Sequence, residues 1–280
     1  MLPTPTDTAW VVDTHVHLYC CYDIAAAIQA AHANLEGLAR NLGLKSFVPA
    51  VCLTERFDHH IFSELKQGRV VRGSGLTIEG SRHPAGLVVQ VRGRATPLIL
   101  LAGRQIVTME RIEVLGLVME DVVPDGLPLE ETLCRVRAAG GIPVLSWAPG
   151  KWFGVRGRRV RDLIQSANPS ELLLGDTSLR PWLWGEPLIM RMGRLRGLRV
   201  VSGSDPLPFP EDAAHAGRLA SVYSPQSRDL GDPVAGIVRS LRSETPWRSR
   251  AGVRLSPISV FIRLLRNYKV TTESRSMQPT

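Results

Sequence analysis

The segment AWVVDTHVHLY (residues 9–19) joins a short apolar run to a cluster of polar side chains. Its first part, AWVVD, is typical of a buried strand. The Ala-rich stretch from Asp23 to Leu42 then carries apolar residues at helical spacing, and Gly43 ends that pattern. This part of the chain is therefore predicted to form a strand followed by a helix.

The same alternation of strand and helix patterns returns along the chain. Strand-like runs cover residues 46–53, 141–147, 171–176 and 198–205, and the helical patterns that follow them cover residues 60–67, 160–167, 187–195 and 211–223. Repeated units of this kind predict an α/β fold with a parallel sheet, either open or closed into a barrel. Between about Leu76 and Met119 the runs are β-rich and separated by Gly and Pro, which predicts a hairpin-rich elaboration inside the barrel.

The C-terminal part of the chain has a different composition. Residues 224–254 are rich in Ser, Arg, Pro and Gly and are expected to wrap the surface. In the segment 256–269 one helical face carries apolar side chains, namely Ile258, Phe261, Ile262 and Leu265. We expect this terminal helix to pack on the barrel, with attachment to a membrane surface as the alternative, and residues 271–280 to be disordered.

Bulk composition excludes several classes of protein. Hydrophobic residues make up 44% and charged residues 21% of the chain, as in an ordinary globular protein, and no apolar run reaches the ~18 residues of a spanning helix. The segment 1–13 lacks the pattern of a secretory signal, so a cytoplasmic protein without membrane contact is expected. The four cysteines form no CxxC pair and are interpreted as reduced thiols.

The net charge of +8 favours acidic partners. Arginine-rich runs at 154–162, 191–199 and 239–250 carry much of this charge. They contain no interleaved aromatic residues, so solvated helix faces explain them better than a nucleic-acid surface. Binding of nucleic acid remains an alternative, and it predicts an affinity that falls steeply with salt.

The motif Asp13-Thr14-His15-Val16-His17 is the sharpest chemical signal. In an extended chain, side chains two residues apart point to the same side, so the imidazoles of His15 and His17 can reach one ion. Asp205, in the turn GSDP, follows the last predicted strand, and strand C-termini are where barrel folds place their active sites. A metal site is one interpretation, and two histidines held by hydrogen bonds are the other.

Five segments together resemble the PHP (polymerase and histidinol phosphatase) domain superfamily. They are DTHVHLY (13–19), CLTERFDHHIFSEL (52–65), LLAGRQIVTMERIEVLGL (100–117), AGGIPVLSWAPG (139–150) and VVSGSDPLP (200–208). The resemblance implies a distorted (β/α)7 TIM-like barrel, here with a β-rich insertion and a C-terminal helical tail. It also implies a clustered metal centre and hydrolysis of phosphoesters. It covers residues 9–222, so we expect a barrel domain over 1–222 and a surface-wrapping segment, terminal helix and disordered tail over 223–280.

The chain departs from the family pattern at several ligand positions. Residues 54–56 read Thr-Glu-Arg in place of Thr-Asp-His, and residues 103–105 read Gly-Arg-Gln in place of Gly-x-Glu. Residues 146–149 read Ser-Trp-Ala-Pro where the family has Ala-His-Pro, and residues 204–207 read Ser-Asp-Pro-Leu where it has Ser-Asp-x-His. Since an amide, an indole and a guanidinium do not replace anionic or imidazole ligands, a full three-metal centre is not expected.

A reduced site remains, with His15, His17 and Asp205 as metal ligands and Glu113 or Glu55 completing it. Either Glu110 or Glu113 faces inward, depending on strand register. Such a set suits one Zn, Mn or Fe ion, which would lower the pKa of bound water.

The remaining roles follow from that site. Asp205 would orient or deprotonate the water. We expect Arg104, Lys151 and Arg180 to hold an anionic substrate, although Arg180 is also placed to pair with Asp176. The sequence thus predicts a metal-dependent hydrolase, of phosphoesterase type, that acts on an anionic small molecule. The alternative is a catalytically inactive PHP-like binding or scaffolding protein whose mouth is blocked by Trp147.

Overall fold

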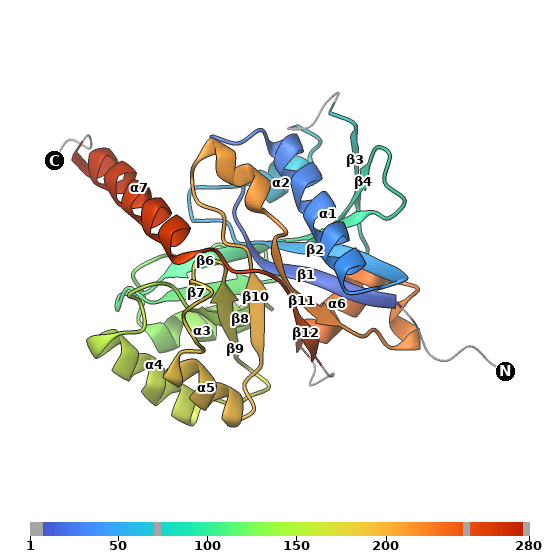
Figure 1. Cartoon of the computed structure of the whole chain (residues 1–280). Coiled ribbons are helices and arrows are strands. Elements are labelled where there is room, and N and C mark those ends of the chain that lie inside the picture. The colour runs from blue at the N-terminus through green and yellow to red at the C-terminus, as the bar shows by residue number, and fades with distance from the viewer. Residues whose placement is uncertain (1–7, 70–73, 243–246, 277–280) are drawn as a thin grey trace.

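The computed structural model describes residues 8–69, 74–242 and 247–276, and it contains two mixed β-sheets with helices against them (Figure 1). In spatial order the larger sheet comprises β12 (Trp247–Gly252), β11 (Leu219–Tyr223), β1 (Thr8–Val16), β2 (Ser46–Leu53), β5 (Leu98–Leu101), β4 (Gly86–Val91) and β3 (Leu76–Gly80). The smaller sheet comprises β10 (Val200–Gly203), β9 (Leu173–Thr177), β8 (Ile142–Ser146), β7 (Glu113–Leu117) and β6 (Gly103–Val107).

Seven α-helices and two short 3₁₀ helices accompany the described strands. They are α1 (Ile24–Asn41), α2 (Ile61–Lys66), α3 (Leu129–Ala138), α4 (Gly154–Ser166), α5 (Leu188–Leu195), η1 (Pro210–His215), η2 (Ser227–Asp229), α6 (Pro233–Arg242) and α7 (Pro257–Ser276). Figure 1 shows α3, α4 and α5 gathered beside the smaller sheet and α1 and α2 beside the larger one. The chain is thus an α/β protein with two sheet-and-helix layers.

The expected closed (β/α)7 barrel is wrong. The parallel units β1–α1–β2 and β8–α4–β9–α5–β10 do form, but antiparallel pairs interrupt them: β3 with β4, β4 with β5, β6 with β7 and β7 with β8. Strand β1 pairs with β2 and β11, and β10 pairs with β9. No described ladder joins β10 to β1, so the strands do not close into a ring. The β-rich region around residues 76–119 supplies strands to both sheets and is not an elaboration inside a barrel.

Strand β11 explains much of this difference. Residues 211–223 were expected to form a helix, but the structure has the short helix η1 followed by a strand that pairs antiparallel with β1. Gly217 separates the two elements at φ 81°, a conformation that favours glycine and ends a helix. A Cβ at this position would lie 2.5 Å from the carbonyl oxygen of Ala31 in α1. The turn therefore packs closely on α1 and directs β11 along the edge of β1.

One large apolar core joins both sheets with α1, α2 and α6. Its buried side chains include Trp10 of the larger sheet and Val144 and Val201 of the smaller one. The smaller sheet packs against α3, α4 and α5 around a second cluster that includes Ile164 and Trp147. Because Trp147 is part of this core, its indole does not have the mouth-blocking position that the scaffolding alternative assumed.

The terminal helix forms, but its expected apolar face is not buried. Helix α7 projects from the body of the molecule (Figure 1), and Ile258, Phe261, Ile262 and Leu265 are all exposed. The helix is held instead by other residues: Val260 is buried, Arg263 pairs with Asp212, and Arg266 pairs with Glu211 and lies over the ring of Phe209. Among the described helices, none is both long enough and apolar enough to cross a membrane.

The two sheets meet where β1 passes the end of β10. The hydroxyl of Thr14 donates to the carbonyl oxygen of Ser202 at 3.1 Å, and the backbone N–H of Asp205 donates to the carbonyl oxygen of His15 at 2.8 Å. These bonds connect the end of the first strand to the turn after β10. The predicted HxH and GSDP motifs therefore become neighbours, although nearly 190 residues separate them along the chain.

Candidate metal centre

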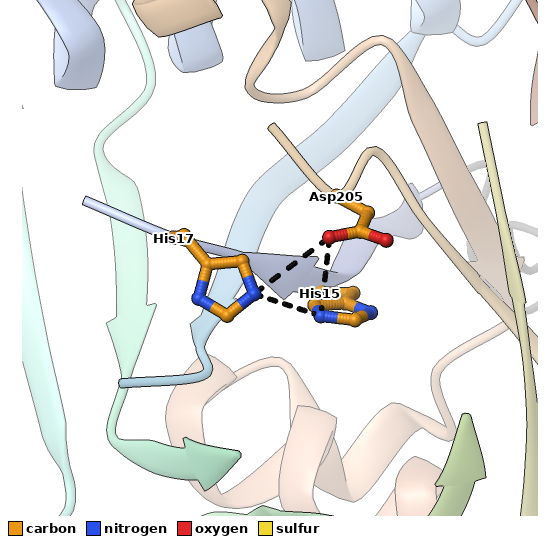
Figure 2. A group of neighbouring side chains, drawn as sticks. All are labelled: His15, His17 and Asp205. Carbon is orange, nitrogen blue, oxygen red and sulfur yellow. Dashed lines mark hydrogen bonds and ion pairs between the residues drawn. The ribbon is translucent and has the colours of Figure 1, made fainter. Parts of the chain in front are cut away.

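The side chains of His15, His17 and Asp205 converge in the interior of the protein (Figure 2). His15 and His17 lie in and just after β1, and Asp205 follows β10. The Nε2 atoms of the two imidazoles are 3.0 Å apart, and Oδ1 of Asp205 lies 3.5 Å from the first and 3.7 Å from the second. All three residues are buried. The three residues that the sequence placed together are thus brought together.

This geometry fits a single metal ion. Imidazole and carboxylate ligands lie about 2.0–2.2 Å from a transition metal, which separates neighbouring ligand atoms by about 3–3.5 Å. The three contacts have nearly this spacing. In addition, Oε1 of Gln105 lies 3.2 Å from Nε2 of His15, so a carbonyl oxygen faces the same point. The group can therefore hold a metal.

Asp13 fixes the backbone around this group. Its carboxylate is fully buried and accepts four hydrogen bonds: from the N–H groups of His15 (3.1 Å), Ser204 (2.9 Å) and Gly217 (2.9 Å), and from the Ser204 hydroxyl. Burial raises the pKa of Asp13 to about 7, and the four hydrogen bonds oppose that rise. One side chain thus ties the strand that carries the histidines to the turn that carries Asp205.

The backbone of Asp205 is turned back toward the histidines. Its φ of 49° lies in the left-handed region, which aspartate tolerates better than most residues. Beside it, Ser146 at the end of β8 lies 3.5 Å from Nδ1 of His15, and the ring of Tyr19 lies 5.3 Å from that of His17. Groups from both sheets therefore surround the two imidazoles and limit their rotation.

Burial sets the protonation of the three side chains. Burial lowers the pKa of His15 to about 4, although the negative charge of Glu113 acts in the opposite direction. Burial and the charge of His15 both lower the pKa of His17, to well below its usual range. Burial, followed by the charge of Glu113, raises the pKa of Asp205 to about 8. The imidazoles are therefore in the neutral form that binds metals, whereas the carboxyl group must release a proton to do so.

The two predicted additional ligands are engaged elsewhere. Glu113 lies in β7 and its Oε1 pairs with Lys151 at 3.2 Å, whereas Glu110 precedes that strand and accepts a bond from the N–H of Leu129. Glu55 accepts a bond from the N–H of Phe62 at 2.7 Å and pairs with Arg104. Neither glutamate belongs to the His15, His17 and Asp205 group, whose ligand atoms lie close enough together to share a metal ion.

The predicted substrate-binding cations also have partners. Arg104 is 3.2 Å from Glu55 and donates to the carbonyl oxygens of His59 and Glu120. Arg180 makes a two-pronged pair with Asp176, with contacts of 2.8 and 2.7 Å. Lys151, in contrast, pairs with a carboxylate whose charge acts on both His15 and Asp205. Of the three cations, Lys151 is thus the one connected to the histidine and aspartate group.

Sequence reasoning missed two members of the surroundings. Gln105 was excluded because an amide does not replace an anionic ligand, yet its oxygen faces His15, and a neutral carbonyl oxygen is a possible metal ligand. Asp13 was noted as part of the HxH motif but was given no role. Its position two residues before a strand-end histidine was a usable signal, since a carboxylate there can cap the adjacent backbone.

Gly203 supports the centre by having no side chain. A Cβ at this position would lie 2.3 Å from Cβ and 2.5 Å from N of His15. We expect Gly203→Ala to push β1 away from β10, to weaken metal binding at least tenfold and to lower the free energy of unfolding by about 2 kcal/mol. Metal titration and urea denaturation measure the two effects. Gly231→Ala, where a Cβ meets nothing within 4 Å, is the matched control and should leave the metal affinity unchanged.

Comparisons with known proteins identify a shared fold but no family. No family model matches the chain, and no curated protein matches it. The crystal structure of PsfC from Pseudomonas syringae PB-5123 superposes with a TM-score of 0.53 at 18% identity, over 94% of this chain and 99% of PsfC.

Two endonuclease structures match less closely. The lesion-specific endonuclease PfuEndoQ from Pyrococcus furiosus gives a TM-score of 0.48 at 12% identity, over 87% of this chain and 59% of the enzyme. An Endonuclease Q complex with a 27-mer duplex substrate carrying an abasic lesion gives 0.43 at 12% identity, over 84% and 56%. The chain thus spans little more than half the length of these endonucleases. The chain shares its overall α/β fold with PsfC.

Proposed function

We propose that the protein is a metal-dependent hydrolase with a PHP-like fold and a reduced, single-ion metal site. The observation that carries this proposal is the convergence of His15, His17 and Asp205, with ligand atoms within 4.8 Å of one another. Zn, Mn and Fe are the candidate ions, because each accepts two imidazoles and one carboxylate and leaves coordination positions open. When bound, such an ion would lower the pKa of water at the site and stabilise negative charge on a substrate oxygen.

The residues of the site have different proposed roles in metal binding and proton transfer. His15 and His17, neutral at pH 7, would hold the ion, and Asp205 would complete the set through Oδ1. The other oxygen of Asp205 is the proposed proton acceptor of the hydrolytic step. Glu113, as the proposed further ligand, would have to leave Lys151 to reach the ion.

The proposed substrate is an anionic, phosphorylated small molecule. Lys151 supports this, because a substrate phosphate that displaced Glu113 from Lys151 would gain a cation beside the metal centre. Arg104 and Arg180 are each held by a buried carboxylate, so we propose that they contribute positive potential and not direct contacts. Phosphoesters carry negative charge and react by attack of water, which matches both the cations and the ion site.

Metal analysis tests this function directly. Protein purified without chelator should contain about one Zn, Mn or Fe ion per chain, and the His15→Ala, His17→Ala double variant should contain none. Hydrolysis of p-nitrophenyl phosphate, added as a general phosphoester, should disappear with the ion. His60→Ala, which removes an exposed histidine outside the group, is the control and should keep both. A wild-type protein that binds no ion would refute the hydrolase and support a binding or scaffolding role.

A further inference from the structure

A cavity separate from the metal centre lies on the other face of the smaller sheet. It has a volume of about 650 Å³ and is bounded by β9 and β10, by helix α5, by the loop after β9 and by the segment around the end of β12. Its charged lining consists of Asp176, Glu186, Arg180, Arg194, Arg250 and Arg254. This size falls within the range of small-molecule sites, which is about 300–1,000 Å³.

The cavity is separate from the metal centre because neighbouring residues of a strand face opposite sides of a sheet. Asp176 lines the cavity, whereas a Cβ on Gly175 would contact Ser146, the residue beside His15. In the same way Ser202 lines the cavity, whereas Gly203 lies against His15. The sheet itself therefore separates the two sites, and they share no residue.

The cavity carries an excess of positive charge. Asp176 is buried and receives three arginines: Arg180 in a two-pronged pair, Arg254 at 2.6 Å and Arg250 at 3.7 Å. One carboxylate cannot neutralise three guanidinium groups. Arg194 is matched by Glu186, so four arginines face two carboxylates. The arginines on Asp176 are held in place before any ligand arrives, which reduces the entropy cost of binding an anion.

Two tryptophans lie at the same cavity. Trp182 and Trp184 line it and leave 56% and 43% of their surfaces exposed, respectively. The ring of Trp184 packs against those of Trp147 and Phe153, with centroids 5.9 Å and 6.0 Å away, respectively. Indoles are large apolar groups that folding normally buries more fully, and exposed aromatic rings beside cationic groups can stack on a planar ligand.

We propose that this cavity binds a molecule that joins a planar aromatic ring to a phosphate group, as a mononucleotide does. The phosphate would bind Arg250 and Arg254, whose charges Asp176 does not fully neutralise, and the ring would stack on Trp182, the more exposed of the two indoles. This site is independent of the metal centre, so it does not depend on the proposed hydrolase function. Its volume of about 650 Å³ lies in the range of small-molecule sites, which favours a small molecule over a nucleic-acid strand.

Isothermal titration calorimetry with adenosine 5′-monophosphate tests the proposal on the full chain. We expect one molecule bound per chain, at least tenfold more tightly than inorganic phosphate or adenosine, with quenching of tryptophan fluorescence. The Arg250→Gln, Arg254→Gln double variant should weaken this binding at least tenfold. Trp182→Ala, which leaves the ion pairs of Asp176 intact, should also weaken it, and it keeps the test valid if the arginine variant does not fold.

Two control variants locate the bound molecule. The His15→Ala, His17→Ala variant should bind the mononucleotide as wild type does, and so should Arg159→Gln, which removes an arginine paired with Glu130 on the surface. Loss of binding in the histidine variant would place the ligand at the metal centre and overturn the proposal. So would the absence of binding at millimolar concentration, unchanged affinity in both cavity variants, or binding of a single-stranded oligonucleotide without binding of the mononucleotide.

Discussion

Replacing Asp13 with alanine is expected to lower the free energy of unfolding by about 3–5 kcal/mol, because four buried donors lose their acceptor together. Three are backbone N–H groups, those of His15, Ser204 and Gly217, and the fourth is the hydroxyl of Ser204. Since these groups belong to β1 and to the turns after β10 and η1, no single segment can move to find other partners. Urea denaturation followed by circular dichroism measures the loss.

Two further variants test the physical reason. Asp23→Ala removes an aspartate that accepts one hydrogen bond, from the N–H of Ala26 at the exposed start of α1, and should cost only about 1 kcal/mol. Asp13→Asn keeps the size and one acceptor oxygen, so it should be intermediate between wild type and Asp13→Ala. If Asp13→Ala cost no more than Asp23→Ala, the carboxylate would not be the link between the two sheets.

The histidine pair of the site could be predicted from sequence because a local rule decides its geometry. The alternation of side chains along a strand puts His15 and His17 on the same side whatever the strand pairs with. That rule holds in an open sheet as well as in a barrel. Asp205 is different: β1 and β10 belong to separate sheets, so its approach to the histidines depends on how the two sheets meet, through bonds such as that from Thr14 to Ser202.

The closure of the sheet could not be predicted, because it depends on which edges pair. The run LASVY (219–223) is short, and its pattern fits either a strand or the end of a helix. It pairs with β1 because Gly217 turns the chain sharply against α1. A close approach of this kind between backbone atoms of distant segments leaves no periodic signal in the sequence.

The surroundings of the site were harder to predict for the same reason. Two ion pairs near the site, Glu113 with Lys151 and Arg104 with Glu55, join residues far apart along the chain. No spacing rule predicts such pairs from the sequence. The terminal helix shows a related limit. Its apolar spacing correctly predicted a helix, but spacing alone could not show that Ile258 and Phe261 would stay exposed while ion pairs hold another face.

The affinity of the centre for a metal is expected to depend on one proton, that of Asp205. Burial raises the pKa of this carboxyl group to about 8, with further upward contributions from Glu113 and Asp212 and a downward one from Arg263. The histidines do not compete for protons above about pH 5, since the pKa of His15 lies near 4 and that of His17 is also low. Below pH 8 a metal ion must therefore displace one proton from the carboxyl group.

We expect the metal affinity to fall about 50-fold between pH 8 and pH 6, close to tenfold per unit at the acid end, as one competing proton requires. The stability of the metal-free protein should change in the opposite sense. Because the folded pKa of Asp205 lies above its unfolded value of 3.8, its contribution is complete below about pH 4 and is lost as the pH rises through 8. Competitive titration of Zn²⁺ at several pH values measures the first effect, and urea denaturation the second.

The variant Asp205→Asn tests whether Asp205 carries the proton that competes with the metal ion. Its amide neither ionises nor supplies a negative charge, so the variant should bind Zn²⁺ more weakly at pH 8 but with little change in affinity between pH 6 and pH 8. In the metal-free state the variant should also lose less stability than wild type as the pH rises over that range. If the variant kept the full 50-fold dependence, the competing proton would belong to another group, and Asp205 would not be the carboxylate that holds the ion.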